Sequence, residues 1–287
     1  MRDDVMTAIR VTRLSKRFGT TQALSDVSLS VEAGEMVALI GASGSGKSTL
    51  IRHIAGLETG EGEASGIAIF GTPVQAGGRM LKGAKAVRGD VSVIFQQFNL
   101  VHRLSVLTNV LIGALGRLPR WRGTLGLFGA SEKTRAREAL ERVGIGHAGP
   151  QRASTLSGGQ QQRAAIARTL VQGARILIAD EPIASLDPAS AKRVMDVLAS
   201  INRDDKITVL VSLHQVDYAR RYFPRTVAMR DGRVVYDGPS SALTNAFLSE
   251  LYGSASEELL LPDAPAAAPP RRPEPVRHPS LGALEAV

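Results

Sequence analysis

One eight-residue segment constrains this chain more than any other, because it matches the phosphate-binding pattern G-x-x-x-x-G-K-[ST] at every defined position. It consists of Gly41, Ala42, Ser43, Gly44, Ser45, Gly46, Lys47 and Ser48, and Thr49 follows it. An apolar run typical of a buried strand (36–40) precedes the segment, and an amphipathic helical pattern (49–57) follows it. This order places backbone N–H groups and a helix N-terminus around an anion. The sequence therefore predicts a site for the phosphates of a nucleotide.

The residue types within this loop indicate separate tasks. Glycines let the backbone wrap around phosphate without a Cβ in the way. We expect Lys47 to reach the β- and γ-phosphates, and the Ser48 hydroxyl to take a place on Mg²⁺. The alternative is a glycine-rich turn that matches the pattern by chance, which the flanking strand and helix disfavour.

Composition excludes several classes of protein. Of the 287 residues, 44% are hydrophobic and 22% are charged, which is ordinary for a globular protein. There is no cysteine, so a disulfide framework and a cysteine-ligated metal are excluded. We expect no membrane-spanning segment, since no apolar run approaches the roughly 18 residues required. We also expect no signal peptide, because residues 1–4 lead into no apolar segment.

The net charge of +8 fits a polyanionic nucleotide or an anionic membrane surface. Nucleic acid is disfavoured as a partner, because aromatic residues make up only 4% of the chain and do not alternate with basic ones.

Apolar strand patterns alternate with helical ones along the chain, which predicts an α/β fold with a mainly parallel sheet. The buried strands are expected at 36–40, 91–95, 176–179 and 207–212. Earlier alternating segments at 9–15 and 23–31 indicate a separate antiparallel layer. A hairpin is expected where Asp231 and Gly232 join two short strands, 226–229 and 233–236.

Between the strands, a long segment is rich in Arg and Leu and has a helical pattern, which predicts an inserted helical subdomain at about 103–165. Residues 118–129 interrupt it with Trp121 and nearby arginines. This interruption is either a solvated loop anchored by Trp121 or a docking element. The Pro- and Ala-rich residues 254–287 are predicted to be disordered.

Two consecutive carboxylates follow one of the apolar strands. Asp180 and Glu181 come directly after 176–179, at the strand end where ligands gather in such sheets. Asp180 suits a partner of Mg²⁺, directly or through water. Glu181 suits a general base that orients or deprotonates an attacking water. Such pairs also occur by chance, but the phosphate loop strengthens this interpretation.

A second anion cradle opens a later helix. It consists of Ser157, Gly158, Gly159 and Gln160, and its alternative is a capped helix that follows a turn. The phosphate loop already serves the nucleotide, so we infer that the two cradles face one nucleotide from two chains. Each copy would lend its Ser157 loop to the nucleotide held by the other.

Together these motifs resemble the ATPase subunit of ABC transporters. The motifs occur in this order: the phosphate loop, Gln96 after a strand, the run 156–160, Asp180-Glu181, the run 185–187, and His214 after a strand. The resemblance covers about residues 9–253. It implies an ABC ATPase domain at 8–253, with a P-loop core, an antiparallel β subdomain and the helical subdomain.

The resemblance also implies roles for single residues. Phe18 would stack on adenine, and His214 would contact the γ-phosphate. Gln96, for which Gln97 is the alternative, would sense the membrane subunit and help to place Mg²⁺ and water. Asp187 would communicate across the dimer. Asp180 matches the family residue that supports Mg²⁺, and Glu181 matches the family residue that acts as the base.

A finer resemblance points to the phosphonate importer subgroup, through the runs 95–101, 103–110, 180–188 and 213–219. It implies ATP and Mg²⁺ as cofactors, a homodimer, an integral membrane permease and, indirectly, an extracytoplasmic solute-binding protein. It implies a peripheral place on the cytoplasmic face of the inner membrane and no nucleic acid. The substrate rests on family analogy alone, because the transported solute never enters this subunit.

Three alternatives remain beside phosphonate import. The first is an ABC importer ATPase for phosphate, an amino acid or a metal ion. The second is a soluble ABC ATPase that acts on nucleic acid or ribosomes, although this chain has neither a long coiled-coil insert nor a second cassette. The third is a non-enzymatic regulatory binder, against which the intact set of Lys47, Asp180, Glu181 and His214 argues.

Overall fold

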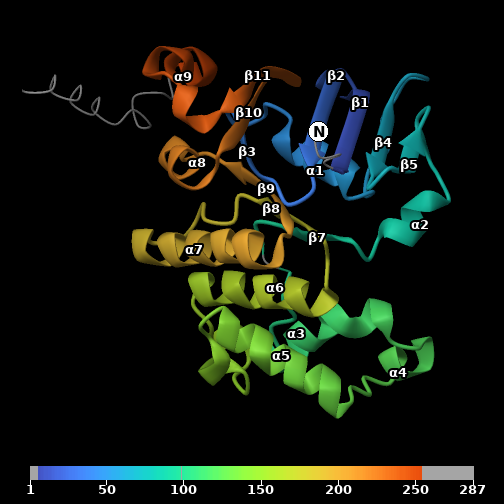
Figure 1. The fold of residues 1–287 in the computed structure, drawn as a ribbon, viewed down its shortest axis with the longest axis vertical. Helices are drawn as coiled ribbons and strands as arrows, with labels where there is room; N and C mark the ends of the chain where they lie inside the picture. Colours follow the sequence, from blue (N-terminus) through green and yellow to red (C-terminus); the bar gives the residue numbers. More distant parts are fainter. Residues whose placement is uncertain (1–5, 98, 254–287) are drawn as a thin grey trace, which may run out of the picture.

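The computed structural model describes residues 6–97 and 99–253, so the predicted disorder of 254–287 lies outside the described residues. The two sheets occupy one half of the molecule, and a layer of helices forms the other half (Figure 1). This arrangement puts the ends of several strands close to the helical layer.

The larger sheet has six strands in the order β11-β10-β3-β9-β8-β7, and all neighbours are parallel except the β10–β11 hairpin. Its strands are β3 (Met36–Ile40), β7 (Val91–Ile94), β8 (Ile176–Asp180), β9 (Thr208–Leu213), β10 (Arg225–Arg230) and β11 (Arg233–Pro239). Every residue of β3, β8 and β9 is buried, as continuous apolar runs in a covered parallel sheet predict. The carboxyl ends of these three strands therefore meet at one edge.

The second sheet is antiparallel and has the order β2-β1-β4-β5-β6. Its strands are β1 (Thr7–Phe18), β2 (Thr21–Glu32), β4 (Gly66–Ile69), β5 (Thr72–Ala76) and β6 (Arg79–Met80). The sequence does not predict β5, because a buried glutamine interrupts its apolar pattern. The amide of Gln75 donates to the carbonyl oxygens of His53 and Glu58, both at 2.8 Å, so this polar side chain is satisfied inside the fold.

Nine α-helices and four 3₁₀ helices lie within the described residues. They are α1 (Lys47–Ile54), α2 (Gly83–Val87), α3 (Val106–Leu111), η1 (Ile112–Arg117), α4 (Arg120–Thr124), α5 (Ala130–Arg142), η2 (Gly146–Ala148), η3 (Ala153–Thr155), α6 (Gly158–Gln172), α7 (Pro188–Asp205), α8 (Val216–Tyr222), η4 (Ser240–Ala242) and α9 (Asn245–Tyr252). No helix in this part of the chain has both the length and the apolar composition needed to cross a bilayer.

Alternate side chains of β3 pack into two hydrophobic cores on opposite faces of the parallel sheet. Val37 and Leu39 pack into the core that α1 shares with the antiparallel sheet. Ala38 and Ile40 belong to the core that continues through α7 and α6 into α3 and α5. The phosphate loop, which follows Ile40, is thus fixed between both cores.

One of the two alternatives for residues 118–129 is wrong. Trp121 does not anchor a solvated loop, because it lies on the short helix α4 with 63% of its surface exposed. A single tryptophan near arginines fits either an anchor or an exposed group, so the sequence pattern alone does not distinguish them.

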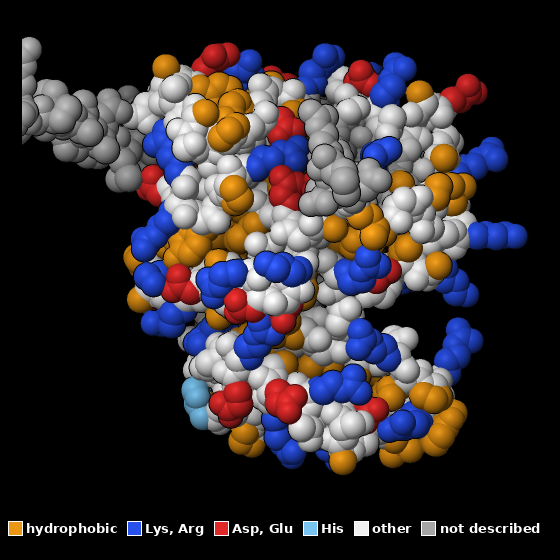
Figure 2. Space-filling model, viewed as in Figure 1, with side chains coloured by type: hydrophobic (Ala, Val, Ile, Leu, Met, Phe, Trp, Pro, Cys, Tyr) orange, Lys and Arg blue, Asp and Glu red, His pale blue; other side chains and the backbone are white. Residues whose placement is uncertain are grey.

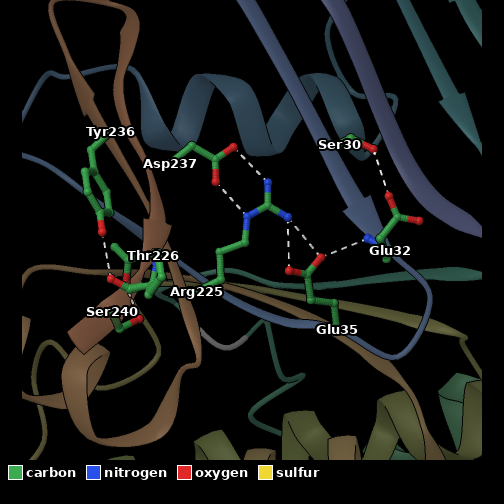
Figure 3. Close-up of polar contacts among 9 residues, drawn as sticks. Ser30, Glu32, Glu35, Arg225, Thr226, Tyr236, Asp237 and Ser240 are labelled. Atoms are coloured by element: carbon green, nitrogen blue, oxygen red, sulfur yellow. Dashed lines mark hydrogen bonds and ion pairs between the residues drawn. The ribbon is translucent and has the colours of Figure 1, made fainter. Parts of the chain in front are cut away.

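An ion-pair network ties the edge hairpin to the turn that leads into β3. The Arg225 guanidinium donates to both carboxylate oxygens of Asp237 at 2.6 and 2.8 Å, and to those of Glu35 at 3.0 and 3.1 Å. Glu35 also accepts the backbone N–H of Glu32, at 2.9 Å (Figure 3). These hydrogen bonds raise the pKa of Arg225 above its ordinary value.

We predict that Arg225→Ala lowers the free energy of unfolding by about 1–3 kcal/mol, less than for a fully buried pair because the side chain is partly exposed. Chemical denaturation measures this loss. The control is Arg233→Ala, because Arg233 is exposed and has no ion pair within 6–97 and 99–253; its effect should stay within about 0.5 kcal/mol. Equal effects of the two variants would contradict the role of the network.

Candidate nucleotide-binding site

The phosphate loop follows a path that requires glycine at two positions. Gly41 and Gly46 have φ angles of 148° and 103°. A Cβ on Gly46 would lie 2.6 Å from the carbonyl oxygen of Ala23, and one on Gly41 would collide with the carbonyl oxygen of Met229. The loop is therefore pressed against neighbouring backbone, where only glycine fits at these two positions.

Lys47 begins α1 with its side chain folded back over the loop. Its ammonium group donates to the carbonyl oxygens of Gly41 at 2.7 Å and Ala42 at 3.1 Å. Burial lowers the pKa of Lys47, and the nearby carboxylates of Glu181 and Asp180 oppose that shift. Lys47 thus supports the loop and faces the two carboxylates.

A serine near the end of β9 positions both carboxylate residues. The Ser212 hydroxyl donates to Asp180 Oδ1 at 2.6 Å, and the same hydroxyl accepts the backbone N–H of Glu181 at 2.9 Å. Ser48 donates to the same Asp180 oxygen at 3.2 Å. The parallel register makes this possible, because it pairs Asp180 directly with Ser212. Asp180 is thereby held beside the loop.

Glu181 leaves β8 with a φ of 51°, a left-handed conformation that is rare for a residue with a Cβ. Its carboxylate oxygen lies 2.5 Å from Nε2 of His214, which follows β9. Such a strained backbone at a ligand site is common in functional loops. The two predicted catalytic side chains therefore form a direct pair.

Two cavities lie around Ser48. The first, about 270 Å³, is lined by loop residues 43–49, residues 21–23 and Glu181. The second, about 540 Å³, is lined by Ser48, Asp180 and Gln96 among others, and Gln97 also lines it. The structure thus brings together the phosphate loop, both carboxylates and the predicted glutamine.

Phe18 lies outside the lining of both cavities. It is the last residue of β1, with 46% of its surface exposed. The Lys16 ammonium lies 5.2 Å from its ring centroid. An exposed ring can stack on a planar base, and this role of Phe18 stays a prediction.

Ser157 and Gln160 form a capping box at the start of α6. The Ser157 hydroxyl accepts the N–H of Gln160 at 3.3 Å, and the Gln160 side chain accepts the N–H of Ser157 at 2.9 Å. A Cβ on Gly159 would lie 2.7 Å from the Cβ of Ser190, and one on Gly158 would lie 3.1 Å from Leu186. The capped helix is present, while the action of this loop on a second copy stays a prediction.

Asp187 caps the next helix. Its carboxylate accepts the N–H of Ser190, the third residue of α7, at 2.9 Å. Hydrogen bonds from the hydroxyl and N–H of Ser190 lower the pKa of Asp187. Its side chain therefore stays ionised near neutral pH, and its predicted role across a dimer is not tested by these contacts.

Sequence reasoning missed two residues that hold the site together. Ser212 is the next-to-last residue of the apolar strand β9, and a polar side chain at that place was the available signal. Tyr252, from α9, accepts the N–H of Gly41 at 3.3 Å and lies 3.5 Å from the carbonyl oxygen of His214. Burial raises the pKa of Tyr252 to about 12. No local sequence pattern predicts the contact between Tyr252 and Gly41, because the two residues lie far apart in the chain.

Comparisons with known proteins agree with this geometry. The ABC transporter family model matches residues 24–184. The phosphonates import ATP-binding protein PhnC of Stutzerimonas stutzeri is 60% identical over 255 residues, covering 88% of this chain and 92% of the relative. PhnC 1 of Pseudomonas aeruginosa (strain UCBPP-PA14) is 59% identical, covering 88% and 91%.

Among solved structures, a dimeric post-hydrolysis state of the ATP-binding cassette MJ0796, bound to ADP and Pi, is similar. It has a TM-score of 0.69 and 30% sequence identity, and covers 82% of this chain and 100% of its own. The chain belongs to the ABC transporter family. The family resemblance and the α/β fold of an ABC ATPase, inferred from the sequence, are confirmed.

We predict that Ser212→Ala lowers kcat for ATP hydrolysis about tenfold or more, because Asp180 and the backbone of Glu181 lose a shared positioning partner. The apparent affinity for ATP should change much less, since the phosphate loop remains intact. Steady-state kinetics measures both.

The matched control is Ser240→Ala, which also removes a buried hydroxyl hydrogen bond, to Thr226, at 2.6 Å. It should lower stability comparably and leave kcat unchanged. Equal kcat values for Ser212→Ala and Ser240→Ala would show that Ser212 has no positioning role.

Proposed function

We propose that this chain is the ATP-hydrolysing subunit of an ABC importer that takes up phosphonates through a separate permease. The observation that carries the proposal is the Glu181–His214 pair at the edge where the phosphate loop meets Asp180. A hydrolase needs a group that orients or deprotonates water at this place, whereas nucleotide binding alone needs only the loop. The solute assignment is supported by the relatives that are 59 and 60% identical.

In this proposal the side chains divide the work. Lys47 binds the β- and γ-phosphates, and Phe18 stacks on adenine. Glu181 orients and deprotonates the attacking water, because its carboxylate lines the same cavity as the loop. His214 steadies Glu181 through their direct contact and reaches toward the γ-phosphate.

The residues also fit Mg²⁺. The Ser48 hydroxyl and the Asp180 carboxylate lie 3.2 Å apart, and Gln96 lines the same cavity, so three oxygen donors converge. No cluster of three or more His, Cys, Asp or Glu suited to a metal occurs in the described part of the chain. Nucleotide phosphates would complete the ligand set. When bound, the ion neutralises charge that develops on the phosphates.

The proposal includes a homodimer and a permease. The Ser157–Gln160 loop of one copy would close on the nucleotide of the other, with Asp187 beside the contact. The dimeric structure of the ATP-binding cassette MJ0796 supports the dimer itself. ATP favours the closed dimer, and hydrolysis reopens it. Gln96 and the helical subdomain, about 103–165 of the 8–253 ATPase domain, would pass the movement to the permease.

These partners imply a peripheral location on the cytoplasmic face of the inner membrane. A solute-binding protein outside the membrane would act indirectly, through the permease. Nucleic acid has no place in this cycle.

We predict that Glu181→Gln slows ATP hydrolysis by roughly 100-fold or more, the low end for loss of general-base help, while ATP binding persists. Phosphate release and equilibrium nucleotide binding measure the two effects. The isosteric amide keeps the hydrogen-bonding shape beside His214, so a fold defect does not account for the loss. Near-normal turnover would remove Glu181 from the role of base.

The same variant tests the solute in cells. A strain that lacks the gene should fail to grow on a phosphonate as sole phosphorus source, yet grow on phosphate. The wild-type gene should restore growth, and Glu181→Gln should not. Growth of the deletion strain on phosphonate, with no second importer present, would overturn the solute assignment and leave the ATPase assignment standing.

A further inference from the structure

Four large apolar side chains lie exposed on the helical half of the molecule, around α4. They are Leu115, Trp121, Leu125 and Leu127, with 38, 63, 67 and 48% of their surfaces exposed; we call them the α4 patch. Helix α4 has no buried residue at all. Exposed hydrophobic side chains gathered at one place indicate a contact surface.

The patch is preformed rather than loosely held. The N–H of Leu125 donates to Trp121 O at 3.2 Å, and the N–H of Leu127 donates to Arg122 O at 2.9 Å. Arg122 lies 3.7 Å from Glu132 at the start of α5, which ties the turn to the helical layer. The exposed side chains are therefore presented by an ordered segment, so binding costs little additional conformational entropy of the backbone.

The charge around the patch is mainly positive, since Glu132 is the acidic residue beside it and lies 3.7 Å from Arg122. Residues 91–131 contain no Asp or Glu, although they contain four arginines. Arg117 and Arg120 flank the patch and are exposed. Arg117 also lines a groove of about 660 Å³ to which Lys85 and Arg88 contribute further positive charge. The acidic residue of that groove, Asp90, lies near a cation of its own, Arg175, at 3.8 Å.

The shape of this surface favours a lipid bilayer over a rigid protein partner. Helix α4 lies at a corner of the molecule in Figure 1, and Figure 2 shows hydrophobic side chains gathered at this corner with Lys and Arg side chains beside them. The four apolar side chains of the patch do not line the adjoining groove, so their contact does not depend on a partner that fits a pocket. Lipid headgroups need no shape complementarity and take up tryptophan and leucine at the interface while arginines bind the anionic groups.

We propose that the α4 patch binds the surface of an anionic lipid bilayer, with Trp121, Leu125 and Leu127 in the interface and Arg117 and Arg120 against the headgroups. This contact adds a lipid anchor to the attachment that the proposed permease provides. A small patch gives weak, reversible binding, which suits a subunit that must move during its cycle.

Trp121 supplies its own probe, because it is the single tryptophan of the chain. The full-length protein is mixed with vesicles of 30% phosphatidylglycerol in phosphatidylcholine, or with vesicles of phosphatidylcholine alone. We expect a blue shift of tryptophan emission, and quenching by brominated acyl chains, with the anionic vesicles. Both signals should weaken as salt rises.

Vesicle sedimentation then measures the contribution of single side chains. Leu125→Ser should weaken partitioning about tenfold and Arg120→Gln about fivefold. The control is Val235→Ser, which removes an apolar side chain that is 39% exposed on β11, and it should leave partitioning unchanged. ATP hydrolysis should be unchanged in all three, so a failure here is separate from a failure of the proposed function.

Two results would overturn the lipid proposal. One is emission from Trp121 that is the same with anionic vesicles as without vesicles. The other is a blue shift that appears only when detergent-solubilised permease is added, which would make the patch a protein contact.

Discussion

The hydroxyl group of Ser212 joins the two carboxylate residues of the site, and the rest of the fold holds that hydroxyl in place. Ser212 donates to Asp180 and accepts from the backbone of Glu181, so one atom sets a carboxylate position and a backbone turn. It can do so because β8 and β9 run parallel in a register that pairs Asp180 with Ser212. The covered, fully buried strands keep that register, since a shift by one residue would turn every side chain to the other face.

The phosphate loop is positioned by the same parallel sheet, through the strand on the other side of β9. It leaves β3, the neighbour of β9, and Ser48 reaches back to the same Asp180 oxygen. Tyr252 links the loop at Gly41 to the backbone of His214. Loop, carboxylates and histidine are thus parts of one hydrogen-bonded assembly, which explains how a nucleotide bound by the loop meets the catalytic pair.

Much of this could be predicted from the sequence, because the decisive features are local. The loop pattern, the continuous apolar strands and the turn at Asp231-Gly232 each lie within a few residues, and the structure contains all three. Their order along the chain indicated the family, which the comparisons confirm.

What could not be predicted depends on contacts between distant segments. Strand β5 was missed because the buried polar side chain of Gln75 is satisfied only by backbone from another element. Tyr252 contacts residues far away in sequence, and only the folded chain brings them together. The exposure of Trp121 likewise depends on how α4 packs, which its sequence pattern leaves open.

We propose that each chain carries two halves of a nucleotide site, the phosphate loop and the Ser157 loop, which face each other only in a dimer. The chain has no cysteine, so Ser43→Cys and Ser157→Cys, both at exposed positions, can be made as separate variants and mixed. In a Glu181→Gln background, ATP with Mg²⁺ should produce a disulfide-linked dimer of the two variants, and neither variant alone should do so. Absence of an ATP-dependent crosslink in the mixture would contradict the claim.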